Sequence, residues 1–224
     1  MSTTDDVDAV GILPEIATTE DMARKFVGKM YGLARTKDID GPAGSDSRGE
    51  LANLRAGLSF TSQSRLRMAK QVAPYTSKLS YLDGKRSGRW FYVVGALFAS
   101  APERRNGGTN VSVGRAFAEI AQDADRGRAN PGKEARFLAL VNSRADSLST
   151  HLRAAINLFD SAKSPVVIDW QMLLTDLCKW DHPDKITQDR WLNDFYRGAR
   201  TGDDEVDVLD ELDTMDNEGE TDED

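Results

Sequence analysis

The amino-acid sequence predicts an all-α protein with two packed helical subdomains and an acidic, disordered C-terminal tail. Apolar residues recur at the helical spacing of i, i+3 and i+4 through most of residues 18–200. Clusters of Gly, Pro, Ser and Asp separate these periodic stretches. Residues 201–224 hold 13 acids and no base, a composition typical of disorder. The predicted units are a flexible acidic lead (1–17), two helical subdomains (18–105 and 106–200) and the tail (201–224).

In the N-terminal subdomain, a first helix is predicted from its apolar face, which comprises Met22, Phe26, Met30 and Leu33. Its N-cap is expected to be one of three residues: Thr19, Glu20 or Asp21. Residues 36–50 are rich in Gly, Pro, Ser and Asp, so we expect a loop there. A second helix is predicted over residues 48–58, with its leucines facing inward and its arginines, Arg48 and Arg55, facing outward.

Two further segments complete this subdomain. Residues 61–82 show helical periodicity, and Pro74 is expected to break the segment into two pieces. The sequence GKRSGRW (84–90) is predicted to be a turn. The run WFYVVGALFAS (90–100) is apolar nearly all round, which places it in the core. Its aromatic and β-branched start also fits a strand, but a lone strand would have no partner, so we predict a helix.

The C-terminal subdomain begins after a linker predicted over residues 101–112. A short helix is expected over residues 113–122, and a Gly-, Asn- and Pro-containing loop over 123–132. Two consecutive helical patterns then occupy residues 133–161, and each pairs an apolar face with arginines. These two patterns are the most informative stretch of the chain.

The ends of the later helices also have sequence signals. Arg144 lies between the two arginine-bearing helices, near an N-cap expected at Ser143 or Asp146. Asp169 is predicted to cap the following helix, and Gly198 to close the last one. Apolar residues mark that last helix: Trp191, Leu192, Phe195 and Tyr196. Core packing is preferred over base stacking for all four tryptophans: Trp90, Trp170, Trp180 and Trp191.

Charge is distributed unevenly along the chain. The net charge is −8, yet residues 1–20 hold five acids and residues 201–224 hold 13, with no base in either segment. All 29 Lys and Arg residues therefore lie in residues 21–200 together with the other 19 of the 37 acids, so this body carries +10. Arginine, which makes bidentate contacts with phosphates, is the commoner base. The pattern fits the binding of a polyanion, and basic surface charge without a function is the open alternative.

The sequence offers little for catalysis. Cys178 and His182 could share a helical face, but two ligands do not make a structural zinc site, and His151 stands apart. The later aspartates are expected at caps or in solvent: Asp169, Asp176, Asp181, Asp184, Asp189 and Asp194. No phosphate-binding loop, dinucleotide fingerprint or nucleophile elbow is present. We therefore expect no enzyme activity, no metal and no cofactor.

Two bulk features bear on location. No apolar run is long enough to span a bilayer, and the acidic N-terminus differs from a signal peptide, so no membrane association is expected. The single cysteine, Cys178, excludes an internal disulfide and fits a reducing cytoplasm.

Three segments carry a resemblance to a known family. They are VSVGRAFAEI, EARFLALVNSRADSLSTHLRAAI, and VVIDWQMLLTDLCKWD followed by WLNDFYR, and together they span about residues 111–197. RGELANLRAG and VAPYTSKL are weaker marks in the N-terminal half. In their order and spacing these segments resemble the small subunit of the type I-E CRISPR Cascade complex, the CasB family.

The resemblance implies a non-catalytic subunit that sits as a pair in an RNA-guided antiviral complex, beside its backbone and large subunits. Such a subunit contacts the guide RNA and target DNA region and helps to hold the displaced non-target strand, without sequence preference. By position in the family pattern, the implied nucleic-acid-binding residues are Arg55, Arg115, Arg136, Arg144 and Arg153, with Arg65 and Lys78 from the less similar half. The loop at residues 35–47 and the acidic tail look like additions to the shorter members.

Other interpretations remain open. The first is a free-standing helical DNA-binding regulator, which would need a base-reading recognition helix. A second is a hydrolase with an unrecognised site, and a third is a scaffold whose arginines meet acidic protein neighbours. For the tail we hypothesise competition with nucleic acid for the basic surface; the alternative is a solubilising role.

Overall fold

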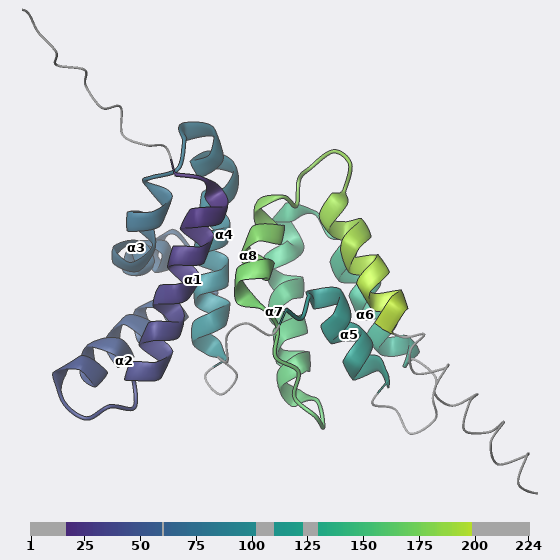
Figure 1. Ribbon diagram of the computed structural model, residues 1–224, viewed down its shortest axis with the longest axis horizontal. Coiled ribbons are helices and arrows are strands. Elements are labelled where there is room, and N and C mark those ends of the chain that lie inside the picture. Colours follow the sequence, from purple (N-terminus) through teal and green to yellow (C-terminus); the bar gives the residue numbers. More distant parts are fainter. Residues whose placement is uncertain (1–16, 60, 102–109, 123–129, 199–224) are drawn as a thin grey trace, which may run out of the picture.

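The computed structural model describes residues 17–59, 61–101, 110–122 and 130–198, and every regular element within these ranges is helical (Figure 1). This confirms the predicted all-α class. The labelled helices are α1 Thr19–Thr36, α2 Pro42–Arg55, α3 Ser62–Thr76, α4 Tyr81–Ser100, α5 Val113–Gln122, α6 Pro131–Val141, α7 Ala145–Ser161 and α8 Trp170–Cys178. A 3-10 turn, Ala56–Ser59, follows α2, and residues 186–198 form a final helix.

The helices form an elongated body in which α1–α4 lie at one end and α5, α6 and the final helix at the other (Figure 1). Although α8 comes late in the chain, it packs against both α1 and α4. α7 contacts α4 on one side and α5 and α6 on the other. The α7–α8 pair therefore joins the two ends of the molecule.

Aromatic side chains connect the buried interior along this body. At the α1–α4 end, Phe98 makes an edge contact with Trp170 of α8, with ring centroids 5.4 Å apart. At the other end, Phe117 of α5 packs on Phe137 and Phe159, and Phe137 stacks on Phe195 with centroids 4.5 Å apart. All four tryptophans are at most 2% exposed, which confirms their predicted place in the core.

The predicted division into two subdomains stays a prediction, because its boundary at residues 105–106 lies outside the described residues. Most of the proposed linker, the loop over residues 123–129, nearly all of the acidic lead and the whole tail lie outside them as well. Within the described ranges, no helix is long and apolar enough to cross a membrane.

Two expected loops are helical instead. The predicted turn over residues 84–90 lies inside α4, because Ser80 caps the helix by accepting a hydrogen bond from the Asp83 N–H at 3.1 Å. Gly88 is buried within α4, where an added Cβ would make an ordinary contact with Thr76 of α3 at 3.9 Å. The predicted loop over 36–50 ends early, since α2 begins at Pro42. Proline suits the first turn of a helix, where its missing N–H costs nothing.

The segment over residues 61–82 is divided between two helices as predicted, but the division follows Pro74 by two residues, since α3 continues to Thr76 and α4 begins at Tyr81. The lost hydrogen bond is the one to the carbonyl of Lys70, an exposed residue whose carbonyl can meet water instead. Because Pro74 lies in the last turn of α3, the helix loses only this one backbone hydrogen bond.

Two helix caps also differ from expectation. Thr18, not one of residues 19–21, caps α1 by accepting from the Asp21 N–H at 3.1 Å. Arg144 itself occupies the N-cap position of α7, in place of Ser143 or Asp146, and its side chain makes no capping hydrogen bond. Asp169 caps α8 as predicted, with Oδ1 accepting from the Met172 N–H at 2.8 Å.

Candidate nucleic-acid interface

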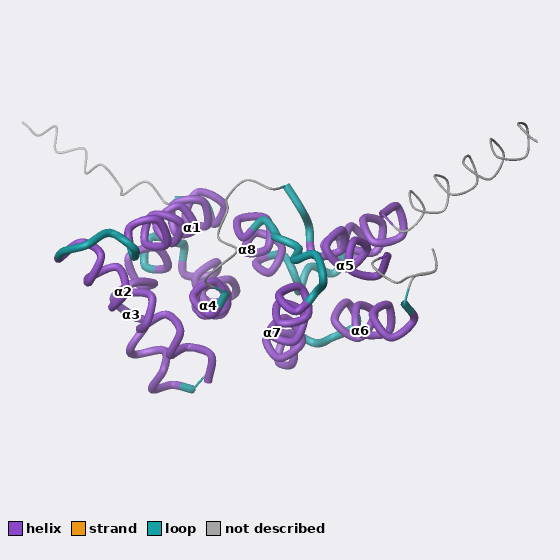
Figure 2. The backbone as a smooth tube through the Cα atoms, turned by 90° about the horizontal axis from the view of Figure 1, so that it is seen from below, coloured by secondary structure: helices purple, strands orange, loops and turns teal. Residues whose placement is uncertain are grey.

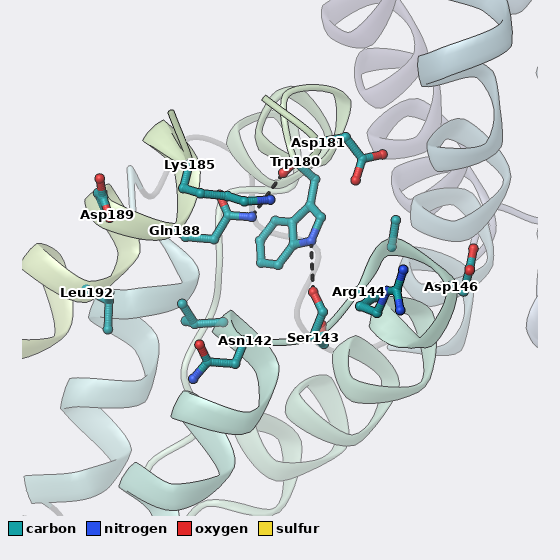
Figure 3. Close-up of a pocket in the computed structure, with 12 residues that line it drawn as sticks. Asn142, Ser143, Arg144, Asp146, Trp180, Asp181, Lys185, Gln188, Asp189 and Leu192 are labelled. Atoms are coloured by element: carbon teal, nitrogen blue, oxygen red, sulfur yellow. Dashed lines mark hydrogen bonds between the residues drawn. The ribbon is translucent and has the colours of Figure 1, made fainter. Parts of the chain in front are cut away.

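Two clefts meet at the start of α7. The first, which we call the junction cleft, has a volume of about 510 Å³ and lies between the α6–α7 connection and residues 180–192 (Figure 3). The second, the α3–α7 cleft, has a volume of about 220 Å³. Ala145 and Asp146 line both clefts, so both clefts border the first turn of α7. Arg144 lines the junction cleft and Arg65 lines the α3–α7 cleft.

The cations of these clefts differ in how far they are already paired. The Arg65 guanidinium lies 5.0 Å from the centroid of the Tyr92 ring, a cation–π distance that leaves its charge available to an anion. Arg89 lies over the Trp90 ring at 4.3 Å and pairs with Asp181 at 3.2 Å and with Asp146 at 3.8 Å. Arg89 therefore joins α4 to α7 and to the segment after α8, and its charge is balanced.

A third cleft lies beside α5 and is called the α5 cleft. Its volume is about 380 Å³, and it is lined by Asn110, Ser112, Arg115, Met172, Arg190, Asp194 and Arg197. Arg115 pairs with Glu119 at 3.4 Å, and its backbone N–H donates to Ser112 Oγ. The Ser112 hydroxyl in turn donates to Asp194 at 2.5 Å. Three guanidiniums thus converge here, from α5 and the final helix.

Asp176 anchors this arrangement from the interior. It was expected at a cap or in solvent, but it is only 3% exposed, pairs with Arg190 and accepts from Trp191 Nε1 at 2.8 Å. Burial raises the pKa of Asp176, while Arg190 and the Trp191 N–H act against that rise. The prediction was wrong because the sequence did not show which residues of α8 are covered by other helices. Asp176 is one of the covered residues.

The seven predicted nucleic-acid-binding residues are all exposed, but they do not form one cluster. Arg144 and Arg65 each line one of the two clefts that border the start of α7. Arg136 on α6 and Arg153 on α7 belong to helices on the same side of the body as α3, whereas Arg115 belongs to α5 on the opposite side (Figure 2).

The remaining two predicted residues lie near the N-terminal helices. Arg55 ends α2, and its Nε donates to the carbonyl of Ala99 at 3.1 Å. Lys78 follows α3 and is exposed. Neither lines one of the three clefts. The assignment of all seven residues to nucleic-acid binding stays a prediction.

Sequence analysis missed four cations that line the clefts: Arg89, Lys185, Arg190 and Arg197. Arg197 ends the WLNDFYR segment and Arg190 directly precedes it, so the motif itself pointed to them. Arg89 gave no such signal, since it was placed in a turn.

The described residues contain no group of His, Cys, Asp and Glu side chains that could hold a metal ion. Burial raises the pKa of Cys178 to about 12, which keeps its thiol protonated and unreactive at neutral pH. His182 is exposed, with Nδ1 3.7 Å from a carboxylate oxygen of Asp184.

The described chain is thus an all-α body in which arginines line clefts at the start of α7 and beside α5. Residues 50–196 match the sequence pattern of the family described as CRISPR-associated protein Cse2. The chain belongs to this family.

Individual relatives agree with the family. A CRISPR-associated protein Cse2 of Thermus thermophilus is 30% identical over 154 residues, covering 69% of this chain and 82% of the relative. The crystal structure of CasB from Thermus thermophilus covers 78% of this chain and 97% of its own, with 24% identity and a TM-score of 0.59. M. ruber CasB has 21% identity, coverages of 84% and 98%, and a TM-score of 0.62. A chain in a CRISPR RNA-guided surveillance complex has 22% identity, coverages of 84% and 99%, and a TM-score of 0.63.

Proposed function

We propose that this chain is a non-catalytic subunit of a Cascade-type RNA-guided CRISPR surveillance complex, acting in antiviral defence in the cytoplasm. The observation that carries the proposal is membership of the Cse2 family, whose pattern covers residues 50–196 and so includes all seven predicted nucleic-acid-binding residues. A chain of this fold occurs in a solved CRISPR RNA-guided surveillance complex, which adds support.

In this role the chain binds nucleic-acid backbone without sequence preference and stabilises the R-loop and the displaced non-target strand. Pairing between guide RNA and target DNA supplies the sequence recognition, so a strand-holding subunit needs charge and shape only. Because R-loop formation is nearly balanced in energy, a few phosphate contacts can shift it. Its proposed partners are the backbone and large subunits, a second copy of itself, the guide RNA and the target DNA.

The exposed arginines set the expected strength of the contact. If five of them each neutralise one phosphate of a single strand, the slope of log K against log salt concentration is about −3.5. The isolated chain would then bind weakly at physiological salt. Within the complex, the high effective concentration of the strand compensates.

The proposal is tested by co-purifying the chain with a tagged effector complex and its guide RNA, followed by footprinting of the displaced strand. We expect the chain to join the complex, and the double variant Arg144→Glu/Arg153→Glu to join it while leaving the displaced strand more reactive. Lys25→Glu, an exposed cation on α1, is the matched control and should behave as wild type.

Two results would contradict the proposal. Failure of the wild-type chain to co-purify would exclude a subunit of this complex. Loss of assembly in the double variant, with strand protection intact in whatever complex remains, would show that these arginines meet protein rather than nucleic acid.

A further inference from the structure

The junction cleft holds polar groups whose hydrogen-bonding capacity is not used within the described chain. Gln188 is only 6% exposed, and its Nε2 donates to the carbonyl of Trp180 at 2.9 Å (Figure 3). This bond fixes the orientation of the amide and leaves Oε1, a buried acceptor, without a partner. A buried acceptor left unsatisfied costs about 1–3 kcal/mol, which makes this atom a candidate ligand contact.

Ser143 provides a second such group across the cleft. Its backbone carbonyl accepts from Trp180 Nε1 at 3.3 Å, but its buried side-chain hydroxyl has no hydrogen-bond partner. Two residues that line the cleft therefore carry one fixed acceptor and one hydroxyl that can donate or accept, and both atoms are buried without a partner. Its volume of about 510 Å³ falls in the range of small-molecule sites.

The charges around the cleft separate an interior from a rim. Three carboxylates line it: Asp146 and Asp181, which share the single guanidinium of Arg89, and Asp189. Two cations also line the cleft, Arg144 and Lys185. The N-terminus of α7, which carries partial positive charge and has no side-chain cap, lies beside Arg144. The rim is thus suited to one phosphate, and the interior to an uncharged group with N–H donors.

From this arrangement we propose that the junction cleft binds one unstacked nucleotide of a single strand. An N–H of the base donates to Gln188 Oε1, the Ser143 hydroxyl makes a second hydrogen bond to the base, and the phosphate lies against Arg144 and the start of α7. Every nucleobase carries an N–H donor, so such a site fits binding without sequence preference. The inference rests on the proposed function and adds a base contact to its backbone contacts.

The test uses the full-length protein and an adenine-rich strand with one 2-aminopurine, whose fluorescence rises when it leaves the stack. We expect the signal to rise as wild-type protein saturates the strand at low salt. Gln188→Met, which removes the acceptor at similar volume, should abolish the rise. It should also weaken binding about five- to tenfold, since one hydrogen bond contributes about 1 kcal/mol.

Two further variants separate binding from folding. Ser143→Ala should reduce the signal without lowering the melting temperature, because the hydroxyl makes no hydrogen bond in the described chain. Asn142→Leu adds apolar bulk at the wall and should also suppress the rise, while Asn157→Leu, an exposed asparagine on α7 that lines none of the three clefts, should not.

The outcomes distinguish this inference from the proposed function. Tight, salt-dependent strand binding without a fluorescence rise would show that only the backbone is bound and that water alone fills the cleft, which overturns the inference and leaves the proposed function standing. No strand binding at low salt would overturn both. An equal rise in wild type and in Asn142→Leu would place the base elsewhere and overturn the inference.

Discussion

At the scale of single residues, Asp176 is the most unusual group. It is a carboxylate at 3% exposure in a chain whose other ionisable groups lie mostly at the surface. Its hydrogen bond from Trp191 Nε1 and its ion pair with Arg190 tie α8 to the final helix. Because Arg190 also lines the α5 cleft, this buried acid positions one of the three guanidiniums there.

The raised pKa of Asp176 has a consequence for stability. Since the folded-state value lies above the unfolded value of 3.8, the folded protein binds more protons between the two, and stability falls as pH rises through that window. Asp176→Asn removes this dependence and keeps an oxygen to accept from Trp191. We expect the difference in unfolding free energy, wild type minus variant, to fall as pH rises above 3.8, by at most about 1.4 kcal/mol per pH unit.

Urea denaturation at a series of pH values measures this difference. Asp46→Asn, the same substitution at an exposed carboxylate of α2, is the control. A difference that instead grows with pH would mean that the Arg190 pair outweighs burial.

At the scale of helices, the packing of α5 against the final helix depends on Gly114. A Cβ at this position would lie 2.1 Å from the carbonyl oxygen of Trp191, so no side chain fits without moving the backbone. This explains the glycine in the VGRA segment by close approach of two helices. It also explains how Arg115, the next residue, comes to face Arg190 and Arg197 across the α5 cleft.

Replacing Gly114 with alanine should therefore destabilise the protein, although alanine has the higher helix propensity. Gly114→Ala would by propensity alone stabilise α5 by about 1 kcal/mol, but forcing the helices apart should give a net loss of about 1–3 kcal/mol. Gly49→Ala in α2 is the matched control: nothing lies within 4 Å of its added Cβ, so it should stabilise by about 0.5–1 kcal/mol. Thermal unfolding of both variants checks the pair, and stabilisation by both would disprove the close approach.

The cap of α8 offers another test at this scale. Asp169→Ala removes the acceptor for the Met172 N–H, and we expect a loss of about 1 kcal/mol in unfolding free energy. The effect should be global, because α8 packs on both α1 and α4. Asp40→Ala, in the exposed turn before α2, should change stability little. If hydrogen exchange became faster only within α8 of the Asp169→Ala variant, the result would argue against α8 as a connecting element.

At the scale of the whole molecule, the predicted nucleic-acid-binding cations lie on more than one side of the body. α3, α6 and α7 lie along one side of the body, and α1, α5 and α8 along the other (Figure 2). The predicted cations divide between these sides, with Arg65, Arg136, Arg144 and Arg153 on helices of the first side or at their ends, and Arg115 on the second. A strand that contacts the first side would not reach the α5 cleft without crossing the body.

The acidic tail belongs to this scale as well. Deleting residues 201–224 removes 13 acids and changes the net charge from −8 to +5. If the tail competes with nucleic acid, the truncated chain should bind a single strand more tightly at low salt, and the gain should vanish at high salt as screening increases. Unchanged affinity at low salt would end the competition hypothesis and leave a role in solubility.

Much of the architecture was predictable because it depends on local patterns. The apolar faces of α1, α5 and α7 repeat at helical spacing, and the Asp169 cap precedes its helix directly. The errors fell where composition suggests a loop but tertiary contacts favour a helix, as at residues 84–90. The seven candidate residues were chosen by residue type and motif. Those criteria identify basic residues, but they do not show which residues share a surface.

The sequence by itself determined that this protein is all-helical, that its folded body is cationic between acidic ends, and that it resembles one family, since periodicity, charge and motif order are all properties of the linear chain. Only the tertiary structure decided which cations are free and which are paired, that Asp176 is buried, and that Gln188 and Ser143 face one cleft. Those facts depend on contacts between residues far apart in the chain, and such contacts exist only once α8 and the final helix have packed against their partners.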